Sequence, residues 1–96
     1  MGIGERLKAN REAVLQLATL HGARNVRVFG SVVRGEATEE SDVDLLVSTS
    51  PQTSAWFPSG FILDLESLLG RRVEVVTDGA LHWYIREKVL QEAVPL

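Results

Sequence analysis

Hydrophobic and polar residues alternate along this chain with a period that changes several times, and each period predicts a different element. Apolar side chains recur at helical spacing in three segments, two of which are followed by a glycine suited to end a helix. These predicted helices cover residues 5–21 before Gly22, residues 61–69 before Gly70, and a last segment from Asp78 or Gly79 to about Glu92. Short runs rich in β-branched and aliphatic residues predict strands at Val26–Phe29, Val43–Val47 and Val73–Thr77.

The segments between the predicted strands complete the expected architecture. Residues 31–41 are too many for a tight hairpin, so a short helical turn and then a loop are expected. Residues 48–60 contain two prolines and many small polar residues, which is typical of a loop or lid. The second strand has aliphatic residues on both faces, which indicates a sheet covered on both sides. The order of elements predicts one α/β or α+β domain over residues 1–96, with a small sheet of undetermined strand order.

Composition narrows the classes of function. The net charge is −3 and no long run of Lys or Arg occurs, which disfavours binding to bulk nucleic acid but not to a single nucleotide. The chain has no cysteine, so disulfides and thiolate metal sites are excluded. It shows neither a signal peptide nor an apolar run of membrane-spanning length, and we expect a cytoplasmic protein. With only 96 residues, a homo- or hetero-oligomer is expected to add stability.

Two carboxylates stand at the head of the second predicted strand. Side chains alternate along a strand, so Asp42 and Asp44 share one face, with Cα atoms about 6.5 Å apart. Such a pair suits Mg²⁺, which takes carboxylate oxygens and completes its coordination with water and substrate phosphates. Glu74, inside the third strand, would add a third carboxylate if the two strands are neighbours. It would hold a metal or accept the proton of an attacking hydroxyl.

Gly30, Ser31 and Arg34 are the candidates for phosphate binding. Gly30 permits a sharp turn and a close backbone approach, and Ser31 opens a helical turn whose amides and hydroxyl suit an anion. Arg34, one turn further on, presents a planar fork of donors. Each piece alone has an ordinary explanation: a solvated acidic pair, a surface arginine, or an exposed ion pair of Glu74 with Arg71 or Arg72. Their combination is more specific than any one of them.

The pattern as a whole resembles a known family. Gly30-Ser31, ten intervening residues and Asp42-Val43-Asp44 resemble the signature of the nucleotidyltransferase superfamily related to DNA polymerase β. The run from Gly30 to Glu36 and the short length are similar to the minimal nucleotidyltransferase group. The resemblance implies the nucleotidyltransferase fold, a small mixed β-sheet flanked by helices. It implies ATP as substrate with Mg²⁺, metal ligation by Asp42 and Asp44, and triphosphate binding by Gly30 and Ser31 with help from Arg34.

The resemblance also implies a partner. Similar proteins are commonly antitoxins that transfer AMP to a tyrosine of a HEPN-type toxin ribonuclease. The third acidic position of the family is usually Asp, and the matching residue here is Glu74, which is one methylene longer. Because a displacement of about 1 Å can cost a hundredfold in rate, this departure favours a slow or inactive enzyme.

Two alternatives follow from these residues. One is a binding module that neutralises the toxin by docking alone, with Trp56 and Phe57 either forming the docking surface or packing over the sheet. The other is a small-molecule nucleotidyltransferase that takes its acceptor pocket from a dimer or a second chain. A short chain has little room for an acceptor domain, so protein modification fits better than modification of a small molecule.

Overall fold

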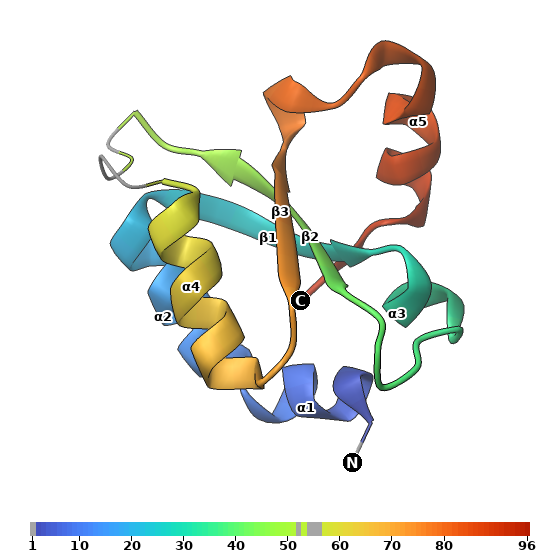
Figure 1. Cartoon of the computed structure of the whole chain (residues 1–96). Coiled ribbons are helices and arrows are strands. Elements are labelled where there is room, and N and C mark those ends of the chain that lie inside the picture. The colour runs from blue at the N-terminus through green and yellow to red at the C-terminus, as the bar shows by residue number, and fades with distance from the viewer. Residues whose placement is uncertain (1, 52, 54–56) are drawn as a thin grey trace.

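The fold is built around a four-stranded mixed sheet, seen in a computed structural model that describes residues 2–51, 53 and 57–96 (Figure 1). The strands are β1 (Ala23–Phe29), β2 (Val43–Thr49), β3 (Val73–Thr77) and β4 (Val94–Pro95), in the order β3-β2-β1-β4. Strand β2 runs antiparallel to β1 and parallel to β3, and β4 runs antiparallel to β1. This is the small mixed sheet that the family resemblance implied.

Helices and one 3₁₀ turn connect and cover the strands. They are α1 (Ile3–Ala9), α2 (Arg11–His21), α3 (Ser31–Arg34), α4 (Ser59–Leu69), η1 (Asp78–Ala80) and α5 (Trp83–Glu92). The predicted helix at 61–69, the helical turn after Ser31 and the three predicted strands are confirmed, with β1 and β2 longer than expected. Gly22 and Gly70 end α2 and α4 in the left-handed conformation, as predicted. Within the described residues, no helix is long and apolar enough to cross a membrane.

Two predictions about the elements were wrong, and one strand was not predicted. The segment 5–21 is not one helix, because Asn10 leaves the helical conformation with φ −107° and ψ 16° and its side chain donates to the Arg6 carbonyl. The last helix does not begin at Asp78 or Gly79, since that segment forms η1 and α5 starts only at Trp83. The strand β4 was not predicted, because two residues carry no readable alternation.

The core lies between one face of the sheet and the helices α2 and α4, which pack side by side in Figure 1. Alternate residues Val43, Leu45 and Val47 of β2 point into it and are fully buried. Leu46 points to the opposite face and is also fully buried, which confirms that the centre of β2 is covered on both sides. Phe57 packs against this core and stacks on Phe61, whereas Trp56 lies outside the described residues.

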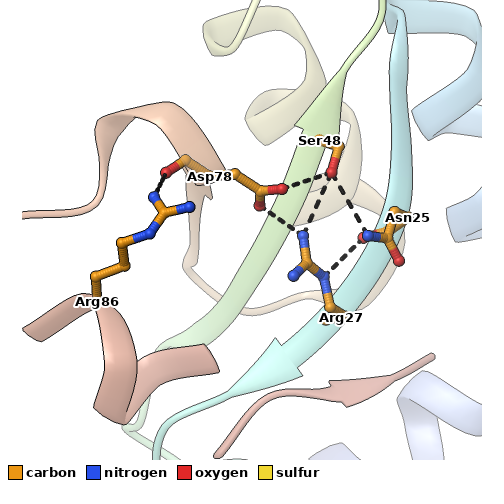
Figure 2. Close-up of polar contacts among 5 residues, drawn as sticks. All are labelled: Asn25, Arg27, Ser48, Asp78 and Arg86. Carbon is orange, nitrogen blue, oxygen red and sulfur yellow. Dashed lines mark hydrogen bonds and ion pairs between the residues drawn. The ribbon is translucent and has the colours of Figure 1, made fainter. Parts of the chain in front are cut away.

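A polar network lies near the end of the sheet at which β2 and β3 finish (Figure 2). Arg27 of β1 donates to Asp78 at 2.6 Å, and the Ser48 hydroxyl of β2 donates to the same carboxylate at 2.7 Å. Arg86 of α5 donates to the backbone carbonyl of Asp78 at 2.7 Å. Asp78 therefore joins two strands to η1 and to the start of α5. Helix α5 has no buried residue and stands apart from α2 and α4 (Figure 1).

Candidate active site

The sheet register brings two of the three predicted carboxylates together. Asp44 on β2 and Glu74 on β3 are direct register partners in the parallel pair, so their side chains share one face. That face is opposite to the core, because Val43 and Leu45 on either side of Asp44 point into the core. Asp42 lies immediately before β2, two residues from Asp44. The condition under which Glu74 would join the aspartates, that their strands are neighbours, is therefore met.

Gly30 closes the same site from the end of β1. It adopts φ 80° and ψ −150°, a conformation that side chains strongly disfavour. A Cβ at this position would lie 2.3 Å from Asp44 Oδ2, so the glycine backbone packs directly against the carboxylate. Ser31 follows as the first residue of α3. The Gly30-Ser31 turn and Asp44 are thus in contact, as a phosphate and metal site would require.

Burial and the negative charges of the neighbouring carboxylates make Asp44 harder to ionise. Burial, the charge of Glu74, a hydrogen bond with Glu74 and the charge of Asp42 raise the pKa of Asp44 to about 6, while Arg34 acts in the opposite direction. Neighbouring carboxylates repel one another, and this repulsion makes Asp44 harder to ionise. A cation bound among them would offset the repulsion, so the raised pKa is consistent with a cation site. Carboxylate oxygens are also the donors that Mg²⁺ prefers, so the residue types fit this metal.

The third predicted carboxylate, Asp42, forms an ion pair with Arg72. The Asp42 side chain lies 3.4 Å from the guanidinium Nε of Arg72; the Arg72 side chain is largely exposed and that of Asp42 is about half-buried. In the described part of the chain, no group of three or more His, Cys, Asp or Glu side chains is arranged to enclose a metal ion. A cation shared by Asp42 and Asp44 would therefore require the Asp42 side chain to rotate away from Arg72. Glu74 forms an ion pair with neither Arg71, which binds backbone carbonyls, nor Arg72, within the described residues.

Arg34 is held by two carboxylates rather than left free. Its Nε donates to Glu36 at 2.5 Å and its Nη1 donates to Glu92 at 2.7 Å. Glu92 also accepts a hydrogen bond of 2.9 Å from the backbone N–H of Gly30. Hydrogen bonds from Arg34 and then from Gly30 lower the pKa of Glu92, which is therefore an anion at neutral pH. Sequence analysis missed Glu92, which lies 58 positions from Arg34 along the chain.

The fold and this arrangement of carboxylates beside a Gly-Ser turn define a nucleotidyltransferase. The family model for the nucleotidyltransferase domain matches residues 9–96, and the chain belongs to this family. A solved structure assigned as a minimal nucleotidyltransferase superposes with a TM-score of 0.87 at 51% identity, covering 100% of this chain and 97% of that one.

Among the relatives of this chain are proteins named as protein adenylyltransferases. The protein adenylyltransferase MntA of Thermococcus cleftensis is 43% identical over 79 residues, which cover 82% of this chain and 80% of the relative. A relative from Methanocaldococcus jannaschii that carries "protein adenylyltransferase" in its name is 31% identical over 84 residues, 88% of this chain and 90% of its own length. A toxin–antitoxin structure with AMP-PNP shares the fold, with a TM-score of 0.75 at 18% identity over 90% of this chain and 71% of that one.

Proposed function

We propose that this chain is a Mg²⁺-dependent antitoxin that transfers AMP from ATP to a tyrosine of a HEPN-type toxin ribonuclease. The observation that carries the proposal is the contact of Asp44 with Gly30 on one side and Glu74 on the other. It unites the residues expected to hold metal with the turn expected to hold phosphate. The adenylyltransferase relatives and the toxin–antitoxin neighbours support the reaction and the kind of partner.

The proposed chemistry assigns each residue one task. When bound, Mg²⁺ would be held by Asp42 and Asp44 and would neutralise charge on the phosphates. Gly30 and Ser31 would hold the triphosphate, with Arg34 beside them. The tyrosine oxygen would attack the α-phosphorus, the bond from that phosphorus to the bridging oxygen would break, and pyrophosphate would leave. Glu74, exposed and opposite Asp44, would accept the tyrosine proton or help to hold the metal.

The experiment that tests this proposal is mass spectrometry of the HEPN-type toxin after incubation with this chain, ATP and Mg²⁺. The expected result is AMP on a toxin tyrosine, and loss of that mass after substitution of the tyrosine by phenylalanine. Asp42→Asn and Asp44→Asn should abolish modification, because an amide oxygen is a poor replacement for a carboxylate at a Mg²⁺ site. Full labelling by both variants would refute the assignment of the aspartates.

Docking without catalysis is the second candidate, favoured by the side chain of Asp42 lying at Arg72 and by glutamate at position 74. The two candidates differ in one assay. Under docking alone, Asp42→Asn and Asp44→Asn proteins would still neutralise the toxin ribonuclease when mixed with it in stoichiometric amounts. Under the proposed function, neutralisation requires ATP and fails in both variants.

A further inference from the structure

Glu92 is the one charged side chain of α5 that contacts the candidate nucleotide site within the described residues. We propose that Glu92 is a positioning residue, which holds the Gly30 amide and the Arg34 guanidinium in the geometry that receives the triphosphate. The inference rests on the proposed function for the identity of the ligand. The contact itself is a property of the fold and is testable without nucleotide.

The two oxygens of Glu92 bridge two parts of the Gly-Ser motif. One accepts from the backbone N–H of Gly30 and the other from Nη1 of Arg34, at 2.9 and 2.7 Å. The Glu92 side chain is 18% exposed, and that of Arg34 is 49% exposed. A single, mostly buried carboxylate therefore fixes the residue at which the chain turns and the cation one helical turn later.

The hydrogen bond from Gly30 to Glu92 also affects the surroundings of Asp44. Because Gly30 packs against Asp44 Oδ2, a change in the orientation of its peptide group would alter the surroundings of that carboxylate. Arg34 is close enough to Asp44 to lower its pKa. Glu92 therefore acts on the site through both of its partners, without a described contact with Asp44 itself.

The arrangement leaves Arg34 able to bind phosphate. A guanidinium carries five N–H donors. Glu36 accepts from Nε and Glu92 from Nη1, so Nη2 and the second hydrogen of Nη1 are not used by these two carboxylates. Restraint by two carboxylates reduces the rotamer freedom that a long side chain would lose on binding. This favours a positioning role over a role as a competitor of phosphate.

The chain beyond α5 keeps Glu92 in place. Two residues later, Val94 and Pro95 pair with Val28 and Arg27 as strand β4. The backbone N–H of Leu96 donates to the Val26 carbonyl at 3.0 Å. Glu92 is thus the last residue of a helix with no buried residue, two positions before a strand fixed on the sheet, and among the described residues its contacts link α5 to the Gly-Ser turn.

Calorimetric titration with AMP-PNP and Mg²⁺ tests the role. Glu92→Gln keeps the size of the side chain but places an amide beside Arg34, and it should weaken nucleotide binding about tenfold. Glu87→Gln removes the same charge from the same helix at a position on a groove with Trp83 and Leu90, and it should change affinity less than about twofold. Tighter nucleotide binding in Glu92→Gln would show competition with phosphate and overturn the proposal.

A double-mutant cycle separates positioning from general destabilisation. If Glu92 acts through Arg34, Glu92→Gln should weaken binding much less in an Arg34→Ala background than in wild type. Binding of Mn²⁺ without nucleotide, followed by paramagnetic resonance, should weaken less than nucleotide binding does, because Glu92 reaches the proposed metal ligand Asp44 only through Gly30 and Arg34. Equal effects of Glu92→Gln on nucleotide binding in both backgrounds, or a larger loss of Mn²⁺ binding than of nucleotide binding, would contradict the inference.

The ligand-free test is hydrogen exchange of the Gly30 amide by NMR. In Glu92→Ala this amide should exchange about tenfold faster than in wild type, while buried amides of β2 keep their protection. Unchanged exchange at Gly30 would overturn the proposal.

If wild type failed to bind AMP-PNP, the proposed function would fail, and the Gly30 measurement would still decide whether Glu92 holds the turn. If the Ala variant does not fold, the same comparison is made with Glu92→Asp, whose shorter side chain cannot reach both partners.

Discussion

At the scale of single residues, the site is dominated by carboxyl groups placed where they destabilise one another. Burial and the charges of Glu74 and Asp42 raise the pKa of Asp44 to about 6. An acid whose pKa is higher in the folded chain contributes stability that is complete below its unfolded pKa and is lost as the pH rises through the folded value. The metal-free protein should therefore lose stability between about pH 4 and pH 6 from this residue.

Asp44→Asn is expected to stabilise the metal-free protein while abolishing activity. At pH 7 it removes one of the mutually repelling charges, and we expect a gain of about 1 kcal/mol, reduced from the full effect of the pKa shift because the site is partly open to solvent. Thermal melts at pH 7 with and without Mg²⁺ test this. A lower melting temperature for the variant in the absence of metal would contradict it.

Protons and Mg²⁺ should compete for the same carboxylates. Because the pKa of Asp44 is raised to about 6, apparent Mg²⁺ affinity should fall as the pH drops through that value. Titration of Mg²⁺ into the protein at pH 5.0 and 7.5, two values about one unit or more on either side, measures the difference. The same affinity at both pH values would show that Asp44 is not a ligand.

Gly30→Ala and Gly35→Ala form a matched pair. Both glycines have positive φ, 80° and 73°, but only at Gly30 would the added Cβ approach Asp44, since nothing lies within 4 Å of one at Gly35. Both variants should lose about 1–2 kcal/mol of stability from backbone strain. Only Gly30→Ala should lose AMP transfer, because the new methyl group displaces the Asp44 carboxylate. Equal activity losses would indicate backbone strain alone.

At the scale of elements, the strands that carry the predicted site residues could be predicted from the sequence, but the position of α5, which supplies Glu92, could not. Local patterns predicted β2, β3 and α4, because each has an apolar face matched to its period. Helix α5 escaped correct placement because its apolar residues face solvent, with Trp83 81% and Tyr84 67% exposed, so spacing gave no reliable boundary. Glu92 carried one weak signal, since an acidic residue in the last turn of a helix opposes the helix dipole and suggests a partner elsewhere.

The contact of Asp44 with Glu74 could be predicted only on the condition that their two strands are neighbours in the sheet. The sequence placed each carboxylate on a strand, but strand order and register are decided by tertiary packing, which leaves β2 and β3 parallel neighbours. The rotation of Asp42 toward Arg72 and the double hold on Arg34 depend on side-chain positions that no local pattern encodes. Residue types therefore predicted the members of the site, and the register assembled two of them.

The link from the sheet to α5 depends on Asp78, and Asp78→Asn should weaken it. Although burial acts to raise its pKa, hydrogen bonds from Ser48 and Arg27 and the charge of Arg27 lower it overall. A lowered pKa contributes stability that is present above the unfolded pKa and lost as the pH falls through the folded value. The variant should lose about 1 kcal/mol at pH 7, with a smaller loss near pH 3. Urea unfolding at both pH values tests this, and an opposite trend would contradict it.

At the scale of the whole molecule, net charge bears on which acceptor the proposed transfer can use. The negative net charge of −3 and the carboxylates of the site disfavour a polyanionic acceptor. Charge alone does not exclude a neutral alcohol or a cationic aminoglycoside. The proposed function does exclude them, since it places the accepting hydroxyl on a toxin tyrosine, and the isolated chain with ATP and Mg²⁺ should show no transfer to small alcohols or aminoglycosides, measured as pyrophosphate release. Rapid release with such an acceptor would favour the small-molecule alternative.

Transfer of labelled nucleotide tests the central claim most directly. The chain is incubated with the toxin, Mg²⁺ and ATP labelled at either the α- or the γ-phosphate. We predict that the α-label appears on the toxin, that the γ-label does not, and that Asp44→Asn abolishes the α-label even though the variant is folded. Labelling of the toxin by the γ-phosphate, or undiminished α-labelling by Asp44→Asn, would contradict adenylyl transfer at this site.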